Sequence, residues 1–376
     1  MPVGYVETQR VVLATADDPL GLTSGQTLPH VEVAYETYGE LSPARDNAVF
    51  VCHALTGDAH AAGHHGDERR RGWWDNIIGP GRPLDTDRFF VVCANLLGGC
   101  QGTTGPSSVN PATGEAYAMD FPLLSVQDFV TAHRRLVAHL GIERLHAVVG
   151  GSLGGMQALS WAMEAPQEVA SAIVVAASSR LSAQNIAFSA VAREAIMRDP
   201  NFQGGRYYGT GTGPDVGLAV ARMMAHITYL SEAAMTSKFG RRLQDSDTPR
   251  FGFGVDFQVE SYLRHQGEVF LSRFDALSYL YLSRALDYYD PFGEPGAQAQ
   301  LDALAAAGTR MLVLSFDSDW RFDTGHSLVI TRTLEHAGVP VTFREVSSPT
   351  GHDSFLLPVE EYHAIVATFL RAHHAS

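Results

Sequence analysis

The chain has 376 residues, of which 45% are hydrophobic and 18% charged, and its formal net charge is −14. This composition is ordinary for a globular protein with a large core, and the length allows one enlarged domain or two. The excess of acidic residues argues against a nucleic-acid partner and against docking on anionic lipid, because both need a basic surface.

The first residues and the cysteines bear on the compartment. The opening MPVGYVETQR lacks the basic and apolar regions of a signal peptide, and no apolar run approaches the ~20 residues that span a bilayer. Cys52, Cys93 and Cys100 are an odd number in a large chain and imply no disulfide framework. We therefore expect a reducing, cytoplasmic setting and no membrane partner.

Strand-like and helix-like segments alternate from residue 47 onward. Residues 47–57 and 88–99 are rich in β-branched and aromatic residues and end in glycine-containing turns, which is typical of buried strands. Residues 125–141 place apolar side chains at helical intervals between a serine and a glycine. The alternation continues with a strand over 144–151, a helix over 156–166 and a strand over 169–179.

Such alternation predicts an α/β fold, with a mostly parallel central sheet flanked by helices on both faces. The alternation lapses from about 181 to 304, where the pattern is mostly helical, and strands return at 309–319 and 341–348 before a closing helix. We predict a core formed by residues 1–182 and 305–376, with a helical insertion over 183–304.

A serine stands among glycines in GGSLGG, which matches G-x-S-x-G through Gly150, Ser152 and Gly154. It follows a predicted buried strand and opens a predicted helix, the context of a nucleophile elbow. A phosphate-binding turn is the alternative, but the G-x-G-x-x-G register is wrong and the lysine of a Walker loop is missing. The pattern predicts that Ser152 is a nucleophile.

A serine hydroxyl needs a base, and the base needs an orienting carboxylate. On a fold of this kind the acid and then the histidine follow the serine after later strands. His352 follows a glycine just past the strand at 341–348 and is the candidate base. Asp317 and Asp319 both follow the preceding strand, and Asp319 is favoured because it lies farther past the strand end.

An oxyanion hole for acyl chemistry needs two backbone N–H groups. Leu153, directly after the serine, is the first candidate donor. Leu55, in HALTGD after an early strand, is the second.

The histidines of HALTGDAHAAGHHGDE raise the possibility of a metal site through His53, His60, His64 and His65. Their spacing resembles no compact zinc signature, and two of them would share a face only on a helix. A polar loop is favoured, and we predict no metal.

With these residues identified, the sequence closely resembles the homoserine O-acyltransferases of the α/β-hydrolase superfamily, and most closely the succinyl-transferring members. The similarity covers nearly the whole chain. It is carried by HALTGDAH, GWWDNIIGPG, NLLGGCQGTTGPSS, GGSLGGMQ, FQVESYLRHQG, RFDALSYLYLSRALD, SDWRF and GHDSF. The resemblance implies an α/β-hydrolase fold with a triad of Ser152, Asp319 and His352, and an insertion that acts as a lid and as a homodimer interface.

The reaction that the resemblance implies is ping-pong transfer of an acyl group from acyl-CoA to the hydroxyl of L-homoserine, a step towards methionine. Acyl-CoA is then a co-substrate, and no cofactor is permanently bound. The resemblance also implies that Arg222 binds the homoserine carboxylate, that Asp353 binds its amino group and that Tyr229 lines the site.

The acyl donor depends on Arg321 in SDWRF. Relatives that use acetyl-CoA mostly have leucine here, whereas those that resemble succinyl-CoA users have arginine. A buried succinyl carboxylate needs a cationic partner, which a guanidinium supplies. The alternative is a structural ion pair between Arg321 and Asp317 or Asp323. We expect succinyl-CoA as the donor and acetyl-CoA as the second candidate.

Three further functions share parts of this pattern. A serine O-acyltransferase would differ only in an acceptor shorter by one methylene, which a pocket discriminates by ~1–3 kcal/mol. A serine esterase or thioesterase would use the same triad with water as acceptor. A non-catalytic binding protein would leave Ser152 unreactive.

Overall fold

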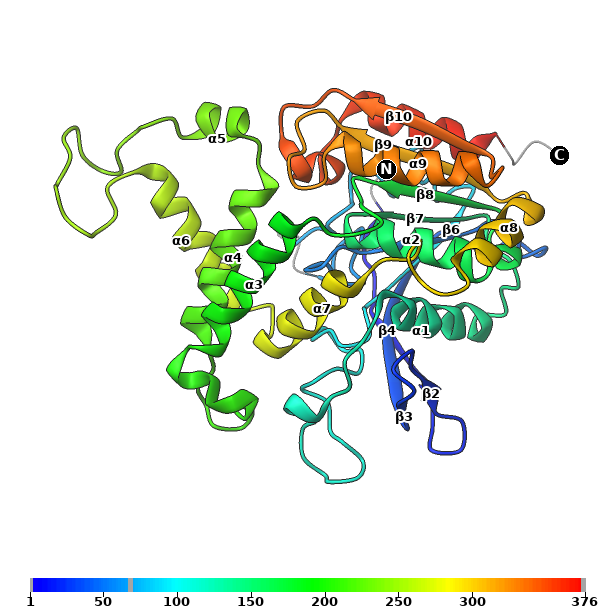
Figure 1. Ribbon diagram of the computed structural model, residues 1–376, viewed down its shortest axis with the longest axis horizontal. Helices are drawn as coiled ribbons and strands as arrows, with labels where there is room; N and C mark the ends of the chain where they lie inside the picture. The colour runs from blue at the N-terminus through cyan, green and yellow to red at the C-terminus, as the bar shows by residue number, and fades with distance from the viewer. Residues whose placement is uncertain (1–2, 67–69, 373–376) are drawn as a thin grey trace.

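The computed structural model describes residues 3–66 and 70–372, which are built around one large sheet (Figure 1). The sheet has eight strands in the order β1-β4-β6-β5-β7-β8-β9-β10. Their bounds are β1 (Gln9–Ala14), β4 (Val31–Tyr38), β5 (Ala48–Cys52), β6 (Phe90–Ala94), β7 (Ala147–Gly151), β8 (Ser171–Val175), β9 (Arg310–Phe316) and β10 (Val341–Val346). A separate two-stranded sheet joins β2 (Leu20–Gly21) and β3 (Thr27–Leu28).

The strands from β6 to β10 in the sheet order run parallel, whereas β1 and β4 pair antiparallel. The predicted mostly parallel sheet is therefore confirmed. Every residue of β5, β7 and β8 is buried, as continuous apolar strands covered on both faces must be. The two antiparallel strands were not predicted, because β1 alternates exposed and partly buried residues at the sheet edge.

Side chains of one strand alternate between two hydrophobic layers. Phe50 and Val148 belong to the layer packed against α1, α2, α8 and α9, while Val51 and Val149 belong to the layer packed against α10. These helices are α1 (Val126–His139), α2 (Leu153–Glu164), α8 (Ala297–Ala307), α9 (Thr324–His336) and α10 (Glu360–Arg371). Helix α1 begins at the predicted residue, because Ser125 and Asp128 form a reciprocal capping box.

Between β8 and β9 the chain leaves the sheet and forms a helical block, which lies to one side of the sheet in Figure 1. Its helices are α3 (Ala183–Met197), α4 (Asp215–Tyr229), α5 (Glu232–Lys238), α6 (Gln258–Leu271) and α7 (Ala276–Tyr288). Helix α4 packs against α3 and α6, while α8 returns to α2. Short 3₁₀ turns complete the described elements: η1 (Ala118–Asp120), η2 (Pro166–Glu168), η3 (Pro200–Gly205) and η4 (Gly351–Leu356). In the described part of the chain, no helix combines the length and apolarity that crossing a membrane requires.

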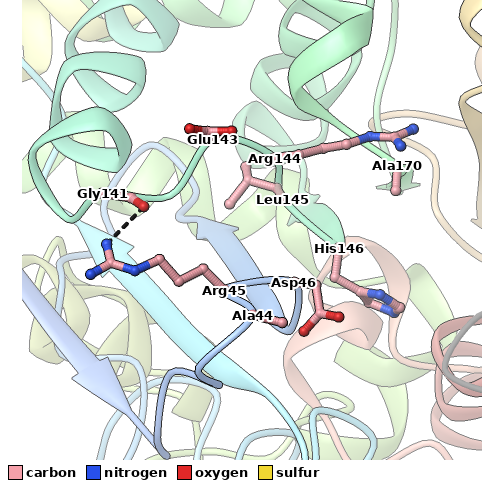
Figure 2. Close-up of a pocket in the computed structure, with 9 residues that line it drawn as sticks. All are labelled: Ala44, Arg45, Asp46, Gly141, Glu143, Arg144, Leu145, His146 and Ala170. Carbon is pink, nitrogen blue, oxygen red and sulfur yellow. Dashed lines mark hydrogen bonds between the residues drawn. The ribbon is translucent and has the colours of Figure 1, made fainter.

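One pocket lies at the amino ends of β5, β7 and β8, between Arg45, Arg144 and His146 (Figure 2). Arg45 is held there by the carbonyl of Gly141, to which it donates a hydrogen bond of 2.8 Å. None of the predicted site residues lines this pocket. The predicted site residues follow the opposite, carboxyl ends of the strands.

Candidate active site

The carboxyl ends of the parallel strands bring together residues that are far apart in the sequence. Strand β5 leads to Leu55, β7 to Ser152, β9 to Asp319 and β10 to His352. Ser152 and His352 line one pocket with residues of the helical block. Its full lining is Ala54, Leu55, Thr56, Ser152, Arg222, His226, Tyr229, Leu286, Arg321, His352, Asp353, Phe355 and Leu356.

Ser152 has the backbone geometry of a nucleophile elbow, with φ 58° and ψ −124° directly before α2. A left-handed conformation costs a non-glycine residue ~1–3 kcal/mol, so the surrounding structure must hold it. A Cβ on Gly154 would lie 2.0 Å from the carbonyl oxygen of Cys52, and one on Gly150 would lie 2.3 Å from the backbone of Gly154. The two flanking positions therefore accept only glycine, as the motif predicted.

His352 and Asp319 form a buried pair, with 2.7 Å between Nδ1 and Oδ2. The other Asp319 oxygen accepts hydrogen bonds from the backbone N–H groups of Arg321 and Phe322, at 2.9 and 3.0 Å. This carboxylate is thus oriented to accept the Nδ1 proton, which leaves the lone pair of His352 on Nε2. That Nε2 atom is buried and has no hydrogen-bond partner in the described structure, so it is free to take a proton from a hydroxyl in the pocket.

Asp317, the other candidate acid, has a different hydrogen-bond partner. Its Oδ1 accepts a hydrogen bond of 3.0 Å from the backbone N–H of Ser348. That bond, with others from the neighbouring Ser347, lowers the pKa of the Asp317 carboxyl below its usual value. Asp317 therefore ties the loop after β9 to the loop after β10 and is not the hydrogen-bond partner of His352.

The two residues predicted as oxyanion donors lie beside Ser152, Leu153 along the chain and Leu55 in the same pocket. Leu153 is the first residue of α2, so its N–H has no acceptor within the helix and adds to the positive end of the helix dipole. Leu55 is buried and lines the same pocket as Ser152.

The end of α4 clamps the loops that carry the acid and the histidine. Trp320 donates a hydrogen bond of 2.9 Å to the carbonyl of Leu230, and the Ser231 hydroxyl bonds the carbonyl of Pro349. A Cβ on Gly351 would lie 2.5 Å from the backbone nitrogen of Ser231, so only glycine permits this approach. We call residues 229–231 the α4 clamp.

Two arginines, the buried Arg321 and the half-buried Arg222, line the pocket without a carboxylate partner among the described residues. Arg321 is only 9% exposed and donates to the Thr228 hydroxyl at 2.7 Å. Arg222 donates to the Thr56 hydroxyl at 3.2 Å, and its Nε is buried without a partner in the described structure. A buried guanidinium without a counterion is costly, so this pocket favours an anionic ligand.

The alternative ion pair for Arg321 is not formed with either candidate. Asp317 bonds Ser348, as described above, and Asp323 caps α9 by accepting a hydrogen bond of 3.3 Å from the backbone N–H of His326. The guanidinium carbon of Arg321 instead lies 5.5 Å from the ring centre of Tyr229.

Asp353 lines the pocket beside these cations. Burial raises the pKa of its carboxyl above the usual value, although the charges of His352 and Arg222 oppose that effect. A cationic group that entered the pocket would stabilise the ionised carboxylate.

Sequence reasoning missed His226, which lines the pocket from α4. Burial, together with the charges of Arg222 and Lys238, lowers the pKa of His226 to about 3. The imidazole is therefore neutral, and its Nδ1 lies 3.2 Å from the Tyr262 hydroxyl. Nothing in the spacing of sixteen histidines distinguishes this one.

The four histidines of the early loop do not converge on one point. His60 Nδ1 and His65 Nε2 each pair with one oxygen of the fully buried Glu36, at 3.0 and 2.6 Å, and these ligand-type atoms lie within 4.8 Å of one another. His53 instead accepts from the backbone of Leu96, and His64 packs against a tyrosine ring. The hydroxyls of Thr8 and Tyr38 complete the hydrogen bonding of Glu36. The cluster is a hydrogen-bonded network that fastens the loop to β4, and sequence reasoning missed its central carboxylate.

Replacement of Glu36 by glutamine should lower the free energy of unfolding by ~3–5 kcal/mol near pH 6, because it leaves the buried His60 imidazole without a counter-charge. Burial raises the pKa of Glu36, but bonds from His60 and Thr8 outweigh burial and leave it lowered. For His60, burial lowers the pKa, but the bond and charge of Glu36 leave it raised. The glutamate contribution is lost as pH falls below about 4.5, and the histidine contribution is lost as pH rises above about 6.5.

The loss measured by urea unfolding should therefore be largest between those pH values and smaller at pH 8. Glu32→Gln is the matched control on the same strand, since Glu32 pairs with Arg10 at the surface and should change stability by less than ~1 kcal/mol. An equal loss from both variants would contradict the assignment of a buried network.

Comparison with known proteins identifies the family of the chain. The family profile of the alpha/beta hydrolase fold matches residues 47–358. A homoserine O-succinyltransferase of Nocardioides sp. is 63% identical and covers 98% of this chain and 99% of its own length. A homoserine O-succinyltransferase of Magnetococcus marinus is 54% identical over 98% of this chain and 95% of its own. A homoserine O-acetyltransferase of Methanobrevibacter ruminantium is 50% identical over 98% of this chain and 74% of its own.

Solved structures of related proteins are also similar to this chain along nearly its whole length. The homoserine O-acetyltransferase of Bacillus anthracis is 28% identical with a TM-score of 0.88, over 97% of this chain and 98% of that one. Esterase E22 is 27% identical with a TM-score of 0.86, over 97% of this chain and 100% of that one.

The fold and the elbow serine therefore define an α/β-hydrolase. Within that superfamily the chain belongs to the homoserine O-acyltransferases, with full-length relatives of both the succinyl and the acetyl class. The resemblance noted from its sequence motifs is confirmed.

Proposed function

We propose that this protein transfers a succinyl group from succinyl-CoA to the hydroxyl of L-homoserine through an acyl-enzyme on Ser152. The observation that carries the choice of donor is Arg321, a buried cation that lines the pocket of Ser152 and has no carboxylate partner in the described structure. The choice of acceptor rests on Arg222 and Asp353, which place a basic and an acidic side chain in the same pocket, as a zwitterionic substrate requires.

In the first half-reaction, His352 Nε2 takes the hydroxyl proton of Ser152 as Oγ attacks the thioester carbonyl carbon. Asp319 holds the imidazole and stabilises its positive charge. The N–H groups of Leu55 and Leu153 bind the oxyanion. The carbon–sulfur bond then breaks, and His352 gives its proton to the departing thiolate of coenzyme A.

The second half-reaction repeats these steps with homoserine. His352 takes the proton of the side-chain hydroxyl, whose oxygen attacks the acyl carbon. Collapse of the tetrahedral intermediate breaks the bond to Ser152 Oγ, which regains a proton from His352.

Homoserine is a zwitterion and needs a partner for each charge. Arg222 pairs with its carboxylate, since among the described residues its guanidinium has a hydrogen bond only to the Thr56 hydroxyl. Asp353 receives the amino group, which relieves the cost of ionising a buried carboxyl. Tyr229 forms a side wall between Arg222 and His352, with ring distances of 5.9 Å to each.

The residues of the insertion, 183–304, act in this proposal as a lid over the pocket and as the interface of a homodimer. Helix α4 supports both roles, because it supplies Arg222 and Tyr229 to the pocket and exposes apolar side chains elsewhere. These exposed residues are Val216, Val220 and Ile227. Use of acyl-CoA, with no permanently bound cofactor, fits the predicted cytoplasmic location.

Ester hydrolysis is the second candidate, and the similarity to esterase E22 favours testing it. Both functions share the acyl-enzyme and differ in whether water or an amino-acid hydroxyl accepts the acyl group. Release of coenzyme A that depends on homoserine, with little release in its absence or with serine, supports the transferase. Fast release without any acceptor supports the hydrolase.

The donor is tested by mixing the protein with equal amounts of acetyl-CoA and succinyl-CoA and measuring the mass added to the peptide that contains Ser152. We expect a succinyl adduct in excess. An acetyl adduct in excess would overturn the role given to Arg321.

A further inference from the structure

A second pocket adjoins the catalytic one. The two pockets share Ala54, Thr56, Arg222 and Leu356, so they lie next to each other. We call the second one the arginine pocket. Its lining is Ala54, Thr56, Gly57, Asp58, His60, Arg70, Arg71, Trp73, Arg222, Arg273 and Leu356.

The arginine pocket concentrates positive charge in an acidic protein. Its lining holds four arginines and one carboxylate, although the chain as a whole carries a formal charge of −14. The carboxylate of Asp58 pairs with Arg70. Arg71, Arg222 and Arg273 have no carboxylate partner within the described residues. Such a charge distribution attracts a polyanion to this one part of the surface.

Arg273 is the best placed of these cations. It donates a hydrogen bond to the carbonyl of Thr56, next to the predicted oxyanion donor Leu55. Burial lowers the pKa of Arg273, and the charge of Asp58 opposes that effect. An anion bound here would compensate the charge of the partly buried guanidinium and would lie beside the loop that carries Leu55.

Homoserine cannot account for this charge, because its single carboxylate is satisfied by one guanidinium. Acyl-CoA carries its thioester at one end of a long arm and a diphosphate and a 3′-phosphate at the other. Because the two pockets adjoin, an arm whose thioester lies at Ser152 can extend towards the arginines. Trp73, which is partly exposed and held by a 2.8 Å bond from Nε1 to the Asp58 carbonyl, supplies an aromatic wall along the route.

We propose that the arginine pocket binds the phosphorylated end of the acyl-CoA donor, with Arg71 and Arg273 as its principal phosphate partners. This assignment rests on the proposed function, because it takes acyl-CoA as the donor. It also explains why Arg71 and Arg273 have no carboxylate partner among the described residues, since phosphate oxygens fill that role when the donor binds.

Equilibrium binding tests the assignment without any chemistry. Coenzyme A is titrated calorimetrically into full-length protein carrying Ser152→Ala, and then into the same protein with Arg71→Gln or Arg273→Gln added. Each added change should weaken binding about tenfold or more, the scale of one charge-assisted contact. Removal of the 3′-phosphate from the ligand should also weaken binding to the parent protein.

Arg144→Gln is the matched control, since Arg144 lines the pocket at the opposite edge of the sheet (Figure 2) and should leave coenzyme A affinity unchanged. Arg273 is partly buried, so its variant is checked for an unaltered melting temperature. Arg71 is exposed and gives the decisive result if the Arg273 variant unfolds. Wild-type affinity in the Arg71 variant, or an equal loss in the Arg144 variant, would overturn the assignment.

Kinetics separate this inference from the proposed function. In the wild type, kcat/KM for succinyl-CoA should exceed that for the succinyl thioester of N-acetylcysteamine, which lacks phosphates, and Arg71→Gln should reduce that ratio about tenfold. If coenzyme A binds and the arginine variants weaken it while no homoserine-dependent turnover occurs, the pocket assignment stands and the transferase assignment falls. If turnover occurs and the ratio is unchanged in the variant, the pocket assignment falls alone.

Discussion

Ser152→Ala should abolish covalent labelling by a fluorophosphonate and reduce homoserine-dependent release of coenzyme A by ~10⁴–10⁶-fold, the scale seen when a triad nucleophile is removed. The reason is that the elbow presents Oγ in the pocket that also contains His352. Without Oγ no acyl-enzyme forms, and the oxyanion donors cannot compensate. Labelling is read by intact mass, and turnover by the free thiol released.

Ser178→Ala is the matched control for this result. Ser178 also contacts a histidine, with 2.8 Å between its Oγ and His326 Nδ1, but it does not line the catalytic pocket. Its variant should label and turn over like the wild type. Persistent labelling of the Ser152 variant would show that another residue is the nucleophile and would remove the basis of the mechanism.

Arg321→Leu should reduce kcat/KM for succinyl-CoA by ~10²–10³-fold and change that for acetyl-CoA by less than about threefold. The succinyl carboxylate would lose its buried cationic partner, a loss of ~3–5 kcal/mol for an uncompensated buried charge. Acetyl carries no such group. The measurement is steady-state kinetics with each donor at saturating homoserine.

Arg321→Lys keeps the charge but loses the planar pair of donors, so it should recover only part of the succinyl activity. Arg332→Leu makes the same substitution at an exposed site on α9 and should leave both donors unaffected. An equal loss for both donors in Arg321→Leu would mean that Arg321 supports the loop after Asp319 and does not select the acyl group.

The parallel part of the fold could be predicted because its strands are buried on both faces and read as continuous apolar runs. The antiparallel part could not, because β1 lies at the sheet edge and alternates exposure, and β4 carries a charged residue, Glu36, into the interior. A buried glutamate is disfavoured unless it is paired, and its partners His60 and His65 lie more than twenty residues away in the sequence.

The residues of the candidate site were likewise only partly predictable from the sequence. The serine is marked by its glycines, and the order of the strands points to the acid and the histidine. The sequence could not decide whether Arg321 is paired, because Asp317 and Asp323 both lie nearby and only the folded loop shows that each has another partner. The arginine pocket could not be predicted from the sequence, because its cations come from distant segments near residues 70, 222 and 273.

The α4 clamp connects the helical block to the loop that carries His352, the proposed base. Residues 229–231 contact the loops that carry both Asp319 and His352. The backbone approaches Gly351 so closely that no side chain fits there. We therefore expect a displacement of α4 away from the sheet to move the loop that carries His352 as well. In such a displaced state His352 would be poorly placed to take a proton from water, so we expect slow hydrolysis of an acyl group on Ser152 even when water can enter.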